Sequence, residues 1–199
     1  MNWDQLEQRH YPDALTCPQI AEENQNYIEQ ELGRDRRTTL LASSRCDDDL
    51  VATNQTLNQE FDGPFQLGGL AGFPFTGKTG MSTYAAPIHK GGTAFILYGP
   101  HIGIAADGSL GKMLRPGQSK RSATCGALAD ALAQIMSGYE PVISYDNFQQ
   151  PQIIKKLSAW RDRILSADIP IQEVTQVCYE FIHEQVNHIV DATFNHFFV

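Results

Sequence analysis

The sequence has little positive charge, few cysteines and no long apolar run. Its 15 lysine and arginine residues are outnumbered by 23 acidic residues, which leaves a formal net charge of −8. A nucleic-acid-binding surface normally needs a concentrated basic face, so we expect no nucleic-acid partner. No stretch approaches the roughly 18 apolar residues of a membrane-spanning helix, so we expect no membrane partner.

The first residues of the chain lack both the apolar core of a secretory signal and the arginine and serine bias of a transit peptide. We therefore expect a cytoplasmic location, or an organelle stroma if a transit peptide has been removed. In a reducing compartment, the four cysteines are more typical of metal binding or of a buried core than of disulfides.

Strand and helix patterns alternate through the middle of the chain, which predicts an α/β fold with a central, mainly parallel sheet flanked by helices. The length suits one domain over residues 1–199. Within it we expect an N-terminal helical arm (1–33), a core that carries the chemistry (34–145) and C-terminal helices (146–199).

Two apolar runs, Thr39–Ser43 and Thr93–Tyr98, have the clearest strand patterns. Weaker patterns predict two further short strands at 102–106 and 142–145. Helical periodicity is found at 18–32, 126–137, 151–165 and 174–190, whereas the part of the arm before residue 18, with Trp3 and Tyr11, is expected to be extended.

Residues suited to metal binding lie in three separate segments. Cys46 and Asp48 follow the first strand, His101 follows the second, and Cys125 begins a predicted helix. Open α/β sheets keep their chemistry at the carboxyl ends of the strands, where these segments can meet. Two thiolates and one imidazole suit zinc, which in catalytic sites keeps a fourth position for water or substrate. The alternative is that these are ordinary core and loop residues.

The chain contains other histidines and cysteines that could serve as ligands. His89 lies in a turn before the second strand and rivals His101 as a ligand. His183 and His188 are five residues apart, which places them about 140° apart around a helix of roughly 3.6 residues per turn. They cannot form the histidine pair of zinc proteases, and we expect them at the surface or in helix packing. Cys178 falls on an apolar helix face and is expected in the core.

The segment Gly72–Thr79 matches Gly-x-x-x-x-Gly-Lys-Thr, the phosphate-binding loop of nucleotide-binding proteins, with Lys78 as its lysine. That loop needs a buried strand before its first glycine, but the preceding residues are rich in glycine. Nucleotide binding is therefore the lesser alternative. We expect the loop to shape the metal pocket instead, with Phe73 or Phe75 as an apolar wall.

Four segments occur in a specific order: Leu-Leu-Ala-Ser-Ser-Arg-Cys-Asp-Asp-Asp (40–49), Gly-Phe-Pro-Phe-Thr-Gly-Lys-Thr-Gly (72–80), Gly-Pro-His-Ile-Gly (99–103) and Gly-Gln-Ser-Lys-Arg-Ser-Ala-Thr-Cys-Gly (117–126). Together they resemble the limiting-CO2-inducible protein B family, which is related to β-carbonic anhydrases. The resemblance implies a β-carbonic-anhydrase-like fold, a homodimer, and Cys46, His101 and Cys125 as Zn2+ ligands. The implied reaction is reversible hydration of CO2 to bicarbonate by zinc-bound hydroxide.

Asp48 matches the acidic residue of the Cys-x-Asp-x-Arg pattern of β-carbonic anhydrases, which makes it the expected catalytic residue. The arginine of that pattern would fall at position 50, which is Leu50. If an Asp–Arg pair forms, its arginine must come from elsewhere, and Arg37, Arg45 and Arg121 are the candidates. The departure keeps a second reading open, in which the chain is a catalytically silent zinc- or bicarbonate-binding module in CO2 handling.

Overall fold

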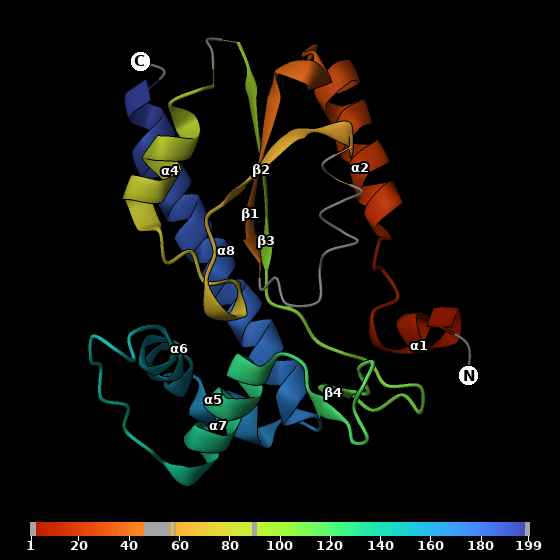
Figure 1. The fold of residues 1–199 in the computed structure, drawn as a ribbon, viewed down its shortest axis with the longest axis vertical. Helices are drawn as coiled ribbons and strands as arrows, with labels where there is room; N and C mark the ends of the chain where they lie inside the picture. The colour runs from red at the N-terminus through yellow and green to blue at the C-terminus, as the bar shows by residue number, and fades with distance from the viewer. Residues whose placement is uncertain (1–2, 46–56, 58, 89–90, 198–199) are drawn as a thin grey trace.

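Three parallel strands form the central sheet of the computed structural model (Figure 1). The structure describes residues 3–45, 57, 59–88 and 91–197. The strand order is β2-β1-β3, so the middle strand is the one that leads toward Cys46. The strands are β1 (Thr39–Arg45), β2 (Asp62–Gln66) and β3 (Thr93–Gly99).

Helices make up much of the remaining described chain. None of those that the structure describes has the length and apolar character needed to span a bilayer. Their bounds are α1 (Trp3–His10), α2 (Cys17–Asn26), η1 (Tyr27–Glu31), η2 (Arg36–Thr38), η3 (Leu70–Gly72), α4 (Gly77–Ala85), α5 (Gly126–Ser137), α6 (Gln149–Ser158), α7 (Arg161–Ser166) and α8 (Pro170–Phe197).

Successive side chains of the strands pack against helices on opposite faces of the sheet. Leu41 belongs to an apolar cluster with α2 and η1, whereas Ala42 belongs to a cluster with α4 and α8. Figure 1 shows the sheet between α2 on one side and α4 and α8 on the other. Because both faces are covered, apolar residues occur at successive positions, 40–42 in β1 and 94–98 in β3, instead of alternating with polar ones. The predicted α/β fold with a parallel sheet is confirmed.

A second group of helices lies beyond the carboxyl ends of the strands. Helices α5, α6 and α7 pack on the first half of α8, with Leu128, Leu157, Ile164 and Val177 fully buried between them. Figure 1 shows this group below the sheet. Ile96 and Tyr98 of β3 pack against the same apolar cluster, which also contains Cys125, so the end of the sheet and the helical group share a core.

Two short strands of the sequence prediction are wrong. Residues 102–106 form an isolated bridge, Ile104 to Leu110, rather than a strand, because the chain already turns back at Gly108. Residues 142–145 form no strand and belong to the connection between α5 and α6, where Val142 is 74% exposed. An apolar pattern of four or five residues was too short to separate strands from such segments.

Three further details differ from the sequence prediction. β2 was missed because its glycine and proline disfavour strands, although an edge strand tolerates both. The helix predicted at 151–165 is divided into α6 and α7 near Trp160. Residues 3–10, expected to be extended, form α1, which is held by burial of Leu6 and by a hydrogen bond between His10 Nε2 and the Gly108 carbonyl.

Candidate metal centre

The predicted site residues are only partly covered by the structure. Cys46, Asp48 and His89 lie outside the described residues. Cys46 directly follows the last residue of β1, so the chain enters its segment at the carboxyl edge of the sheet. Within the described parts of the chain, no three His, Cys, Asp or Glu side chains gather as a metal-binding cluster. The observable geometry is therefore that of the segments around His101 and Cys125.

Backbone hydrogen bonds tie the His101 segment to the Cys125 segment. The Gly103 amide donates to the Thr124 carbonyl at 3.3 Å, and the Gly111 amide donates to the Gly103 carbonyl at 2.8 Å. The Thr124 amide in turn donates to the Gly111 carbonyl at 2.9 Å. A Cβ at position 103 would lie 2.8 Å from the Thr124 hydroxyl oxygen, so this approach requires glycine. The two predicted ligands thus stand on adjoining segments.

The end of β1 is joined to the same region. The Ser44 hydroxyl donates to the Gly72 carbonyl at 3.0 Å in a buried hydrogen bond. Arg45, the last residue of β1, pairs with Gly99 of β3, two positions before His101. Gly72 itself lies so close to Gly99 that a Cβ there would overlap the Gly99 carbonyl oxygen. The ends of β1 and β3 and the turn η3 therefore meet at one edge.

The environment of Cys125 suits a metal-binding thiolate. Its side chain is 2% exposed, and the residue is the N-cap of α5. The positive end of a helix dipole stabilises a thiolate at that position. The Nε2 atom of His101 is also shielded from solvent. A buried thiol and a buried imidazole nitrogen on adjoining segments fit two of the three ligands that zinc would need.

Cys178 lies in the same apolar cluster as Cys125 and is fully buried, so the prediction of a core role is confirmed. Its Sγ lies 3.8 Å from the Ala71 carbonyl oxygen. Burial raises the pKa of the Cys178 thiol, and electrostatic interaction with Cys125 raises it further. The Cys178 thiol therefore stays neutral at physiological pH.

The loop predicted to wall the pocket contributes a stacked pair of rings. The Phe73 and Phe75 ring centroids are 5.6 Å apart, and Phe73 belongs to the cluster that holds Cys125. The two rings also line a hollow of about 300 Å³ together with Phe148 and Phe181. A part for either ring in a metal pocket stays a prediction.

Comparison with known proteins identifies the family. A family model described as limiting CO2-inducible proteins B/C, β-carbonic anhydrases, matches residues 14–197. This chain belongs to that family. No curated protein matches the chain.

Solved structures of limiting CO2-inducible proteins share the fold. The structure of PtLCIB4, a homologue of the limiting CO2-inducible protein LCIB, is 28% identical with a TM-score of 0.87, over 96% of this chain and 81% of that one. A point variant of PtLCIB4 matches with 26% identity and a TM-score of 0.80, over 94% and 80% of the two chains. The structure of LCIB itself is 18% identical with a TM-score of 0.67, over 97% and 81%.

In this family member, the arginines proposed to pair with Asp48 are unequally placed. Arg37 lies before the amino end of β1 and donates to Asp35, so a seven-residue strand of roughly 3.3 Å per residue separates it from the carboxyl edge. Arg121 donates to Asp107 at 2.7 Å on the surface. Arg45 is the last residue of β1, at the carboxyl edge of the sheet, and its Nε donates to the Ser43 hydroxyl at 3.2 Å.

Arg115 was not singled out from the sequence, although its position is informative. Its guanidinium is partly buried and donates to the Ser122 hydroxyl at 2.6 Å and to the Ala123 carbonyl at 3.2 Å. Those two residues lead directly into Thr124 and Cys125. A lone arginine in a polar loop carries no sequence signal for such a position.

The phosphate-loop pattern of this family member lacks the required surroundings. The strand β2 ends at Gln66, six positions before the first glycine of the pattern, and α4 begins at Gly77. The Gly72 backbone is packed against Ser44 and Gly99. Because that backbone is covered, it cannot cradle a phosphate there.

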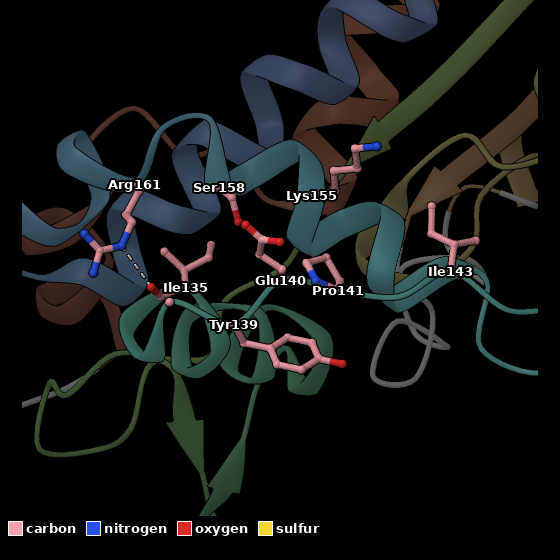
Figure 2. A pocket seen from close by; sticks show the side chains of 9 residues that line it. Ile135, Tyr139, Glu140, Pro141, Ile143, Lys155, Ser158 and Arg161 are labelled. Carbon is pink, nitrogen blue, oxygen red and sulfur yellow. Dashed lines mark hydrogen bonds between the residues drawn. The ribbon is translucent and has the colours of Figure 1, made fainter.

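A separate hollow of about 510 Å³ lies between the end of α5 and helices α6 and α7. Figure 2 shows its lining, with the Arg161 guanidinium donating from Nε to the Ile135 carbonyl at 3.1 Å. Lys155 and Glu140 also line it. Of the predicted metal and pocket residues that the structure describes, none belongs to this lining, so the hollow is distinct from the segments around His101 and Cys125.

Proposed function

We propose that this chain binds one zinc ion through Cys46, His101 and Cys125 and hydrates CO2 reversibly to bicarbonate. The observation that carries the proposal is the junction of the His101 and Cys125 segments at the edge where β1 leads into Cys46. Membership of a β-carbonic-anhydrase-like family supports it. The His101 imidazole and the two thiolates match the donors that zinc prefers.

The chemistry divides between the ion and the protein. When bound, zinc lowers the pKa of water to about 7, which supplies hydroxide at neutral pH. The protein contributes a water-poor setting, since the side chain of Cys125 is buried against apolar residues. Asp48 would supply a carboxylate that accepts a hydrogen bond from the attacking hydroxide and so orients it. Phe73 and Phe75 supply apolar surface for uncharged CO2.

A catalytically silent zinc or bicarbonate module is the second candidate function. One observation favours it: position 50, where the β-carbonic anhydrase pattern has arginine, is Leu50. An orienting aspartate without its arginine can itself become a ligand, which would close the fourth position. Arg45 is the described residue best placed to take the arginine's part, since it ends β1 at the same edge.

Metal content and CO2 hydration separate these functions. Purified wild-type protein should contain one zinc per chain, and Cys46→Ala should lose it, while the control Cys17→Ala in α2 keeps it. Stopped-flow CO2 hydration should exceed the blank and fall about 100-fold in Asp48→Ala, as for a residue that orients the reacting group. Zinc without hydration in the wild type would establish the silent module. Protein without zinc would refute the enzyme and the zinc-dependent form of the silent module.

The homodimer is also part of this proposal. The strand β3 lies at an edge of the sheet, and its apolar residues from Thr93 to Tyr98 remain partly exposed. Tyr27 and Leu32, at the end of the N-terminal arm, are exposed as well. A second copy that covers such surfaces removes them from water. Light scattering should then give twice the chain mass of 22.1 kDa.

A further inference from the structure

Helix α8 holds the carboxyl end of β3 through three rings. The hydroxyl of Tyr98 and the Nδ1 atom of His183 share a hydrogen bond of 2.6 Å. The Tyr179 ring stacks on Tyr98 with centroids 6.4 Å apart and lies 6.0 Å from the His183 ring. The other ring nitrogen of His183 is 3.1 Å from the Asn187 amide, which fixes the orientation of the imidazole. We call Tyr98, Tyr179 and His183 the aromatic clamp.

The aromatic clamp acts on the residue that follows Tyr98. A Cβ at Gly99 would lie 3.8 Å from Cδ2 of Tyr179, so the ring covers one side of the Gly99 backbone. The Gly72 backbone lies against the carbonyl oxygen of Gly99. Gly99 is therefore held between α8 and the turn η3. His101 follows only two residues later.

A cavity explains why this support matters. A space of about 370 Å³ lies between the segment that contains Pro100 and Ile102 and the first turns of α8. Tyr98 and Tyr179 are among the residues that line this space. Because packed atoms are missing beside Pro100, contacts at Tyr98 and Gly99 fix the direction in which the chain leaves β3, and the hydrogen bonds of Gly103 hold the chain after His101.

We infer that the aromatic clamp positions the segment Gly99–His101 for metal binding, with Tyr98 and His183 as positioning residues. This inference rests on the proposed function, because it takes His101 as a zinc ligand. A ligand presented by a loop binds metal tightly only when its direction is set beforehand, and residues that orient ligands commonly contribute 10- to 100-fold to affinity. The clamp sets that direction from the side opposite η3.

The inference differs from a purely structural role of the same contacts. If Tyr98 and His183 serve only to dock α8, their loss lowers thermal stability and leaves the zinc affinity of the folded protein unchanged. If they position His101, their loss weakens zinc binding and alters the geometry around the metal even where the protein stays folded. Zinc affinity and a cobalt spectrum are the readouts that separate these cases.

The experiment uses the full chain, stripped of metal and titrated with Zn2+ against a chromophoric chelator, and then with Co2+ alone. Tyr98→Phe removes one hydroxyl and keeps the ring, so it tests the hydrogen bond with little risk to folding. His183→Ala removes both the bond and the ring, whereas His183→Asn restores an amide near the position of Nδ1. His188→Ala is the matched control, an exposed histidine of the same helix.

We expect Tyr98→Phe and His183→Ala to bind zinc about 10-fold more weakly than the wild type. We expect both to shift the cobalt ligand-field bands, His183→Asn to recover most of the affinity, and His188→Ala to match the wild type. Wild-type binding in Tyr98→Phe and in every folded His183 variant would overturn the clamp alone. Absence of zinc binding from the wild type would overturn the proposed function and, with it, the clamp.

Discussion

Backbone lies directly against backbone at the carboxyl edge of the sheet, whereas apolar side chains fill the space between helices α5 to α8. At the sheet edge, Gly72, Gly99 and Gly103 allow segments from distant parts of the chain to touch. In the helical group, fully buried side chains such as those of Leu157 and Ile164 fill the space between the helices and stabilise their packing.

The two kinds of contact respond differently to change. A side-chain core relaxes around a smaller or reshaped residue, at a cost in stability that depends on the cavity left behind. A backbone contact has no side chain to adjust, so an added methyl group must displace a whole segment. The candidate metal centre is built on contacts of the second kind, which fix position more strictly than they add stability.

The largest expected effect comes from Gly72→Ala. The added Cβ would overlap the Gly99 carbonyl oxygen, and the φ angle of +80° is unfavourable for alanine. We expect a loss of about 3 to 5 kcal/mol in the free energy of unfolding, from overpacking and backbone strain together. Zinc affinity should fall as well, because the displaced turn η3 contacts Gly99, two residues before His101. Urea denaturation and zinc titration measure the two effects.

Gly117→Ala is the control for that prediction. Gly117 has a φ of +81°, but an added Cβ would meet nothing within 4 Å. In this variant the unfolding free energy should fall by about 1 to 2 kcal/mol, which is the strain of alanine in a left-handed backbone conformation alone. Equal losses in the two variants would mean that the contact between Gly72 and Gly99 does not constrain the sheet edge.

Leu157→Ala tests the other side of the comparison. Leu157 is fully buried in the helical group, so its truncation should cost about 3 kcal/mol of unfolding free energy through lost burial and a new cavity. We expect the variant to bind zinc as the wild type does at temperatures where it is folded, since no backbone contact at the sheet edge changes. A parallel loss of zinc affinity would show that packing within the helical group also determines the geometry of the metal centre at the sheet edge.

The smallest effect is expected from Arg121→Ala. Hydrogen bonds from Arg121 and Ser109 hold the pKa of the Asp107 carboxyl well below its ordinary range. Because the folded-state pKa is depressed, the stabilisation is present above the unfolded value of about 3.9 and is lost as the pH falls through the folded pKa. The pair is solvent-exposed, so its contribution is small.

NMR titration of the Asp107 carboxyl measures that change directly. In Arg121→Ala, its pKa should rise toward the ordinary value for aspartate. CO2 hydration should stay at the wild-type rate, because Arg121 is already paired on the surface. A clear drop in hydration would restore Arg121 as a candidate partner of Asp48.

The sequence predicted the elements whose pattern is long and whose ends are marked. The runs that became β1 and β3 are apolar on both faces, and Gly138 follows α5 in the left-handed conformation of a helix end. β2 carried opposing signals, since a glycine and a proline stand in a five-residue strand. Its place at the sheet edge depends on tertiary contacts that local patterns do not contain.

The approach of the His101 and Cys125 segments was predictable from the sequence, because residues that follow parallel strands gather at one edge of a sheet, and the full ligand set stays a prediction. The residues that support the site were not predictable from the sequence. Tyr98 reads as an ordinary strand residue, and His183 was set aside because its spacing to His188 excludes a zinc-protease pair. The bond between Tyr98 and His183 joins residues 85 positions apart, a distance over which a single sequence carries no pairing signal.

Helix α8 takes part in two of the hydrophobic clusters. Over its 28 residues it contributes Val177 and Ile182 to the helical group, and Ile189 to the cluster that covers one face of the sheet. Unfolding of this helix would expose apolar surface in the helical group and on the sheet at the same time. The sheet and the helical group are therefore expected to melt in a single calorimetric transition, whose measured enthalpy equals the van't Hoff enthalpy.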